Sequence, residues 1–168
     1  TVTGVQTCAL PISAGLPAVL DADVPVPKDG RLFEAATHIA FSLAGLRDFS
    51  GCSEDTAATS EALRELAESR ARWCCVTQGA AGVLIADGRV SGRSPVMRHL
   101  PAFRVTAVDT LGAGDVWHGA FALALAEGSS EEVAVRAASA AAAIKVTRAG
   151  GRAGTPTRNE RDALLERS

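Results

Sequence analysis

The sequence predicts an α/β fold in which a mostly parallel sheet is flanked by helices. Short apolar runs of strand length alternate along the chain with longer stretches of helical pattern. A run that is apolar throughout, without alternation, is typical of a parallel strand covered on both faces. The 168 residues are enough for one domain with a sizeable core, and a composition of 47% hydrophobic and 21% charged residues is that of a globular protein.

The first half of the chain contains three predicted parallel strands and two predicted helices. We expect the strands at Ala18–Leu20, His38–Ser42 and Arg72–Thr77. The first strand runs into Asp21 and Asp23, so its acids lie at the carboxyl end, where α/β sheets bind ligands. Helical patterns cover Leu32–Ala36 and about Glu54–Ser69, the second with Ser53 as its predicted N-cap.

Two further predictions concern the middle of the chain. The pair Asp87-Gly88 stands between Val83–Ala86 and Arg89–Ser91, which predicts a β-hairpin with a two-residue turn. Another strand is predicted over Arg104–Val108, and it delivers the chain to the glycine-rich segment Asp109–Asp115.

Three predicted helices follow that segment. The first extends from Val116 to Glu127 and ends at Gly128. A capping-box pattern at Ser129–Glu132 begins the second, which reaches about Arg148, and a similar pattern at Pro156–Glu160 begins the third. The apolar residues of the first helix fall on one stripe: Trp117, Ala120, Phe121, Ala124 and Leu125.

The segment Asp109–Asp115 reads Asp-Thr-Leu-Gly-Ala-Gly-Asp and leads directly into a helix. A helix start has unpaired backbone N–H groups and a partial positive charge, so it attracts an anion, and Gly112 and Gly114 let a phosphate approach closely. A carboxylate at Asp115 is unfavourable beside phosphate unless it acts chemically, as a general base on an attacking hydroxyl would. The alternative is a capping Asp after an ordinary glycine-rich turn.

Composition argues against several other classes of protein. The net charge of −2, from 17 Lys+Arg and 19 Asp+Glu, favours no nucleic-acid partner. The Ala-rich apolar stretch is interrupted by Arg136 and Lys145, so it is too short to cross a membrane. No zinc spacing, dinucleotide-binding Gly-x-Gly-x-x-Gly or P-loop motif occurs. We therefore expect a reduced cytoplasmic chain, with Cys8, Cys52, Cys74 and Cys75 as free thiols.

The glycine-rich segment and the following Val116–Phe121 resemble the C-terminal signature of ribokinase-like (PfkB-type) carbohydrate kinases. The resemblance implies a ribokinase-like layered fold and phosphorylation of a hydroxyl on a sugar or sugar derivative, with ATP and Mg²⁺. Asp115 matches the family's catalytic base, and the N–H groups of Gly112, Ala113 and Gly114 match its anion hole. Asp109 matches a position near a monovalent-cation site; alternatively, it ends a strand and fixes its turn.

Three other features fit the same family. Thr77–Gly82 resembles its second nucleotide segment, which implies nucleotide contacts from Thr77, Gly79 and Gly82, although Gly-x-x-Gly is also an ordinary turn. The Ala-rich Val133–Ile144 resembles the helix that packs against adenine, and close helix–sheet packing explains it equally. His118 shares a helix side with Asp115, either to contact nucleotide or substrate or as a packing residue.

The chain departs from the family at two positions. It has Asp21–Pro25 where members commonly carry Asp-x-Asn-x-Arg, and Ser42-Leu43-Ala44-Gly45 where they carry the Asn-x-x-Glu linked to Mg²⁺ and phosphate. The metal arrangement is therefore open, and Asp21 and Asp23 are candidate substrate contacts. Sequences of a sulfofructose-kinase-like subgroup depart from the family pattern in a similar way, and His118 and residues 150–157 of this chain resemble that subgroup.

The resemblance covers Gly15–Leu165 and corresponds to the C-terminal half of the family's chain. Residues 14–168 are predicted to be that part of the kinase domain, and residues 1–13 a non-native leader or else a native linker. Without the N-terminal half and its lid, we expect little or no kinase activity from this fragment. The implied partners are ATP and a small sugar-like substrate, with no nucleic acid or membrane, and a homodimer is compatible with the full-length protein.

Two alternatives to a sugar kinase remain open. A nucleoside or hydroxymethylpyrimidine kinase of the same superfamily shares the anion hole and differs in the missing half. A non-catalytic nucleotide-binding or interaction module needs no base, and Asp115 argues against it because phosphate binding alone does not need a carboxylate there.

Overall fold

The computed structural model describes residues 14–26, 30–70, 72–90 and 92–167, which form two compact units. The first unit comprises the described residues up to Gln78 together with Val83–His99. The second comprises Gly79–Gly82 and the chain from Leu100 onward. The leader predicted over residues 1–13 lies outside the described residues.

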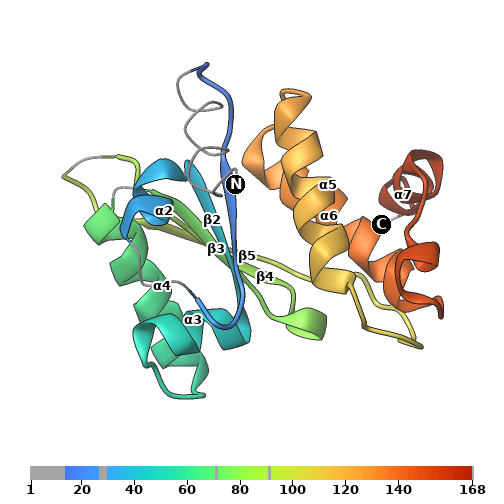
Figure 1. The fold of residues 1–168 in the computed structure, drawn as a ribbon, viewed down its shortest axis with the longest axis horizontal. Helices are drawn as coiled ribbons and strands as arrows, with labels where there is room; N and C mark the ends of the chain where they lie inside the picture. Colours follow the sequence, from blue (N-terminus) through green and yellow to red (C-terminus); the bar gives the residue numbers. More distant parts are fainter. Residues whose placement is uncertain (1–13, 27–29, 71, 91, 168) are drawn as a thin grey trace, which may run out of the picture. The chain divides into compact units, whose positions relative to one another are not determined.

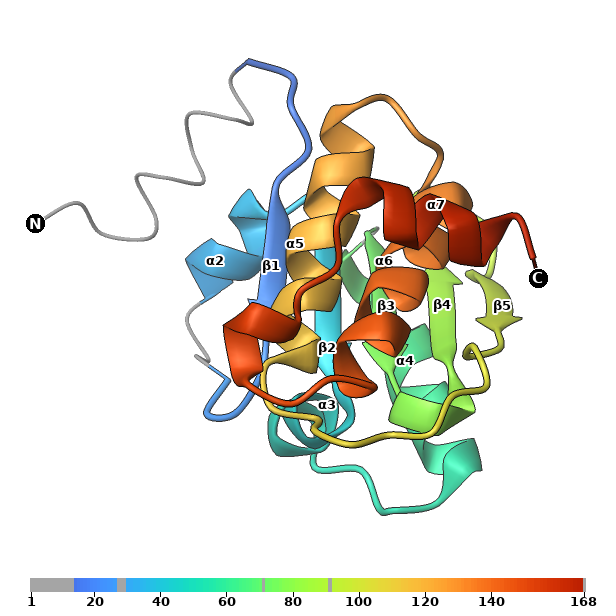
Figure 2. The same ribbon diagram turned by 90° about the vertical axis from the view of Figure 1, so that its right-hand side faces the viewer.

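The first unit contains a mixed sheet with the strand order β1-β2-β3-β4-β5. The strands are β1 (Val19–Ala22), β2 (His38–Ser42), β3 (Trp73–Thr77), β4 (Val83–Asp87) and β5 (Val96–Leu100). Both β1 and β3 run parallel to β2, whereas β4 runs antiparallel to β3, and the strands lie side by side in Figure 2. The α/β class and the three predicted parallel strands are confirmed.

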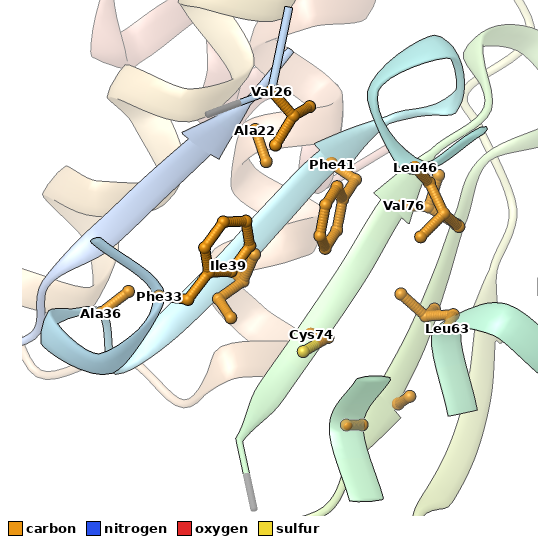
Figure 3. Packing of buried hydrophobic residues seen from close by; sticks show 12 residues of the cluster. Ala22, Val26, Phe33, Ala36, Ile39, Phe41, Leu46, Leu63, Cys74 and Val76 are labelled. Carbon is orange, nitrogen blue, oxygen red and sulfur yellow. The ribbon is translucent and has the colours of Figure 1, made fainter. Parts of the chain in front are cut away.

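Three helices lie on one side of these strands: α2 (Gly30–Ala35), α3 (Leu43–Ser50) and α4 (Thr56–Arg70) (Figure 1). Alternate strand residues face them because successive side chains of a strand point to opposite faces. Figure 3 shows the resulting core, in which strand side chains meet those of the helices. Its largest members are Phe33, Ile39, Phe41, Leu46, Leu63 and Val76, all at most 1% exposed. Burial of each such side chain contributes about 1.5–3 kcal/mol.

The vicinal cysteines of β3 confirm the expected alternation. Cys74 belongs to this core and Cys75 points to the other face, so the two thiols do not form a bond with each other. Both are fully buried. Burial raises the pKa of the Cys74 thiol to about 12 and that of Cys75 well above its usual range, so both stay protonated and unreactive.

The second unit is built from α5 (Ala113–Ala126), α6 (Glu131–Val146) and α7 (Arg158–Leu165), with short 3₁₀ turns at Gly79–Ala81 and Gly151–Gly154. Helices α5 and α6 pack along one another (Figure 1). The Trp117 indole donates a hydrogen bond to the Ser139 hydroxyl at 3.2 Å across this contact. Small side chains let the two helices approach closely, and most alanines of α6 are buried. None of the helices in the described ranges is long and apolar enough to span a membrane.

The capping box predicted for α7 is confirmed, whereas the N-cap of α6 is Ser130 and not the first residue of the predicted Ser129–Glu132 box. Ser130 accepts a hydrogen bond from the Val133 N–H. Thr157 and Glu160 form a complete capping box, and the Arg148 guanidinium beside Glu160, together with the Thr157 donors, lowers the pKa of that carboxyl to about 2.

The predicted hairpin at Asp87-Gly88 is wrong. No strand follows directly, and the next one is β5. The Asp87 carboxylate instead accepts hydrogen bonds from the backbone and guanidinium of Arg89. Gly88 permits close packing rather than a left-handed turn, because a Cβ there would lie 2.1 Å from the Ala67 carbonyl oxygen of α4. Ser91 lies outside the described residues.

Two other local predictions need correction, and one helix was missed. Residues 104–108 form no strand, and the Val108 N–H instead donates to the Val146 carbonyl at 2.6 Å. Helix α4 is capped by Asp55 and not by Ser53, because the Asp55 carboxylate accepts from the N–H groups of its first turn. Helix α3 was not predicted.

Candidate functional site

The glycine-rich segment forms the N-terminus of α5. Gly112 is the N-cap, with φ 75°, a left-handed conformation that favours glycine, and no side chain caps the helix. Of the first N–H groups, that of Ala113 donates to the Thr110 carbonyl at 3.1 Å. The N–H groups of Gly114 and Asp115 belong to the first turn, which has no carbonyl partners within a helix. This terminus therefore presents backbone donors and a partial positive charge to an anion.

Asp115 lies in this first turn and is exposed. Among the described residues its carboxylate forms no hydrogen bond or ion pair. The space around Gly114 is open, because a Cβ added there would meet no atom within 4 Å. An exposed carboxylate can accept a proton from an incoming hydroxyl, and the role of Asp115 as that base stays a prediction.

His118 follows one turn later on the same side of α5. Its Nδ1 donates to the Gly114 carbonyl at 2.9 Å, and its ring packs edge-on to Trp117 at 5.2 Å between centroids. Both contacts fix the imidazole against its own helix, which agrees with the packing interpretation. A contact from His118 to nucleotide or substrate stays a prediction.

Asp109 is the most heavily bonded residue of the segment. Its Oδ1 accepts from the Leu111 N–H at 2.9 Å, and its Oδ2 accepts from the Gly151 N–H at 3.3 Å. The Nζ of Lys145 donates to the Asp109 carbonyl at 2.9 Å and to Oδ2 at 3.4 Å. The Leu111 and Gly151 amides, and then the Lys145 ammonium, hold the pKa of the Asp109 carboxyl below its ordinary value.

Lys145 is the residue of this region that sequence reasoning missed. It lies in the last turn of α6 and is 0% exposed, although lysine is almost never fully buried unless it is paired. The only signal in the sequence was a lysine after a long alanine-rich stretch of a helix that also carries Arg136. Its pairing with Asp109, 36 residues earlier in the chain, is a tertiary contact.

The second predicted nucleotide segment is a compact turn. Gly79 and Gly82 have φ values of 57° and 95°, and the Gly82 N–H donates to the Gly79 carbonyl at 3.1 Å. A Cβ on Gly82 would lie 2.2 Å from the Leu100 carbonyl oxygen, so glycine is required there by packing alone. The Thr77 hydroxyl donates to the Phe41 carbonyl at 3.3 Å. Nucleotide contacts from Thr77, Gly79 and Gly82 stay predictions.

The two departures from the family pattern meet at the start of α3. The Ser42 hydroxyl accepts from the Gly45 N–H at 2.9 Å and donates to Oδ1 of Asp23 at 2.6 Å. A Cβ on Gly45 would lie 2.0 Å from the Ala22 carbonyl oxygen. No side chain fits at Gly45, so no acid can take the place that the family's Glu has. Asp21 lies exposed on β1 beside these residues.

The structure thus brings together Asp109, the start of α5 and Asp115 in the second unit. Asp21, Asp23 and Ser42 lie together in the first unit, as does Thr77. No group of three or more His, Cys, Asp or Glu residues within the described ranges could hold a metal ion.

Comparison with known proteins identifies the family. The profile of the pfkB family of carbohydrate kinases matches residues 7–158. The ribokinase of Bacillus subtilis is 44% identical over 90 residues, which are 54% of this chain and 29% of that protein.

Two solved structures share the fold across nearly the whole chain. A putative ribokinase from Agrobacterium tumefaciens superposes with a TM-score of 0.85 at 35% identity, covering 97% of this chain and 51% of that one. The ribokinase of Arabidopsis thaliana, solved with ribose and ATP, gives a TM-score of 0.78 at 27% identity, covering 98% and 52%. The chain therefore spans about half the length of these structural relatives.

Proposed function

Because the chain belongs to the pfkB family of carbohydrate kinases, we propose that it carries the phosphoryl-transfer half of an ATP-dependent sugar kinase. The observation that supports this most directly is the uncapped N-terminus of α5 with the exposed Asp115 in its first turn. The substrate that we propose is a sugar or sugar derivative with a free hydroxyl. Its exact identity depends on the half of the domain that this chain does not contain.

The proposed division of roles is the one that the family resemblance implies, and the exposed Asp115 and uncapped start of α5 support it. The Asp115 carboxylate accepts the proton of the substrate hydroxyl as that oxygen attacks the γ-phosphate of ATP. Backbone N–H groups at Gly112 and Gly114 face the charge that develops on the transferred phosphoryl group, where each such donor is typically worth about 10²–10³ in rate. The family's anion hole also includes the Ala113 N–H. Because this N–H already donates to the Thr110 carbonyl, we assign it a smaller contribution to stabilising the phosphoryl group.

The nucleotide contacts that we propose come from Thr77, Gly79 and Gly82 as well as from the start of α5. Magnesium would enter with the phosphates of ATP, whose negative charge it neutralises. The residues at the start of α3 do not fit a protein-bound Mg²⁺, because Ser42 is engaged as a cap and Gly45 has no space for a side chain. Asp21 and Asp23 remain proposed substrate contacts.

The experiment that tests this proposal restores the missing half. The chain is fused behind the upstream half of a full-length relative, and ADP release is measured against a panel of sugars. Asp115→Asn is expected to lower kcat by about 10²–10⁴, because the base is lost while the charge-neutral amide keeps the shape. Asp162→Asn, which changes a half-exposed acid on α7, serves as the matched control and should leave kcat unchanged.

Turnover retained in the Asp115→Asn fusion would contradict the assignment of the base. The unfused 168-residue chain should bind ATP in a calorimetric titration and release little or no ADP. If the unfused chain binds ATP but the fusion phosphorylates no sugar, the proposal of a sugar kinase is wrong. A kinase with a nucleoside-type acceptor, or a non-catalytic nucleotide-binding module, would then be the better interpretation.

A further inference from the structure

A buried ammonium group lies where the family resemblance predicts a monovalent cation. Lys145 is fully buried, and its Nζ donates to two oxygens of Asp109, the backbone carbonyl at 2.9 Å and Oδ2 at 3.4 Å. These oxygens are the ones that Asp109 could offer to a metal ion, since a hard cation such as K⁺ is bound by carbonyl and carboxylate oxygens.

The remaining surroundings of Asp109 do not fit a second cation. The amide N–H groups of Leu111 and Gly151 both point at the carboxylate, and both are donors. A metal ion placed on the same oxygens would meet these hydrogens and the ammonium charge at close range. The residues present therefore fit Lys145 and not a free monovalent cation.

The chain also makes room for the lysine stem. A Cβ added at Gly154 would lie 3.1 Å from Cδ of Lys145 and 3.2 Å from Cβ of Arg148, so any larger residue there would press on the stem. The ammonium group also lies near the C-terminus of α6, whose carbonyl dipoles favour a positive charge. The Val146 carbonyl at that terminus accepts from the N–H groups of Val108 and Asp109, which ties the loop before α5 to α6.

We propose that the ammonium group of Lys145 replaces the monovalent cation, so that a covalently attached charge holds the segment leading into α5 and K⁺ is not required. The inference rests on the proposed function only where it treats this segment as part of the phosphate site. Lys145 acts here as a positioning residue, since it contacts Asp109 and not the reacting atoms.

The test measures the midpoint of thermal unfolding of the 168-residue chain without nucleotide. The salts are KCl, NaCl and tetramethylammonium chloride at equal ionic strength, so that screening is matched and only site binding differs. The wild-type midpoint should be the same in all three salts. A rise specific to K⁺ or Na⁺ in the wild type would overturn the proposal.

Lys145→Ala provides the complementary measurement, because it removes the charge and opens the space. Its midpoint should be lower and should recover by about 2–4 °C in K⁺ relative to tetramethylammonium. Lys145→Met removes the charge but fills the space, so it should not recover. A purely structural role for the lysine would give no ion-specific recovery, and a folded Lys145→Ala without recovery would overturn the proposal.

Two further outcomes are distinguishable. If Lys145→Ala does not fold, the wild-type comparison decides alone, since identical midpoints support the proposal and a K⁺-specific rise contradicts it. Failure of the chain to bind ATP would count against the proposed function and would leave these midpoints unaffected, because no nucleotide is present.

Discussion

Helices α3 and α5 begin in segments that the family pattern links to phosphate and metal, yet their first turns are built differently. At α3 the Ser42 hydroxyl accepts from the Gly45 N–H and donates to Asp23. At α5 the N-cap is Gly112, and no side chain caps the turn. One helix start is closed by its own side chains, whereas the other is left open to an external anion.

This difference distinguishes a helix start with a side-chain cap from one whose N–H groups are available to a ligand. A side-chain cap satisfies the orphan N–H groups of a helix and stabilises it, but it also occupies the place that a phosphate would take. In this chain the positions that the resemblance aligns with the family's Asn-x-x-Glu are a cap, Ser42, and a packing glycine, Gly45. The start of α5 has no side-chain cap, so we place the proposed phosphate site there.

The largest expected effect comes from adding a single methyl group to each first turn. Gly45→Ala places a Cβ 2.0 Å from the Ala22 carbonyl oxygen, so we expect the free energy of unfolding to fall by about 3 kcal/mol. Gly114→Ala meets nothing within 4 Å in a helical position and should raise it by up to about 1 kcal/mol. Urea denaturation of both variants measures this contrast, and equal stabilities would contradict it.

A second, smaller pair of effects separates stability from nucleotide binding. Ser42→Ala removes the cap of α3 and should lower the free energy of unfolding by about 1 kcal/mol with no change in the Kd for ATP. Gly112→Ala must hold φ near 75°, which costs a similar amount, about 1–2 kcal/mol, and should also raise the Kd for ATP about tenfold.

Calorimetric titration of ATP into the two variants provides the measurement, with the wild-type chain as reference. If Ser42→Ala weakened ATP binding as much as Gly112→Ala, the contrast between the two helix starts would be lost. If neither changed the Kd, the phosphate site would not lie at α5.

Several elements of the fold were predictable from local sequence. Apolar runs of strand length indicated β1 to β3, and Thr157 with Glu160 indicated the start of α7, because both signals act between near neighbours in the chain. The start of α5 was likewise predictable, since glycines and an acid directly precede an apolar helix.

The rest depends on contacts between distant parts of the chain. The burial of Lys145 requires Asp109, and an isolated lysine in a helix otherwise indicates a solvent-exposed face. Gly88 was interpreted as a turn residue because Asp-Gly favours hairpins, whereas the structure uses its missing side chain for contact with α4. Helix α3 was missed because its glycine, Gly45, lowers helix propensity and is explained only by the Ala22 backbone.

The smallest expected effect is a loss of stability at low pH. The segment before α5 is held by a carboxylate, which titrates, whereas the cap of α3 is a hydroxyl, which does not. The pKa of Asp109 lies below its ordinary value of 3.8, owing to the Leu111 and Gly151 amides and then to Lys145. A depressed folded-state pKa contributes stability that is present above the unfolded value and is lost as the pH falls through the folded one. This contribution should therefore begin to fall near pH 3.8 and be lost as the pH passes the lower pKa of the folded chain.

Asp109→Asn tests the origin of that loss. The variant should be less stable than the wild type at pH 7, and the difference should shrink as the pH falls from 5 towards 3, since the wild type alone loses the interaction of the Asp109 carboxylate. Ser42→Ala is the matched control, because its hydroxyl does not titrate and its deficit should be constant over the same range. Urea denaturation at each pH gives both differences, and a deficit of Asp109→Asn that stayed constant with pH would show that its carboxylate charge contributes nothing to the start of α5.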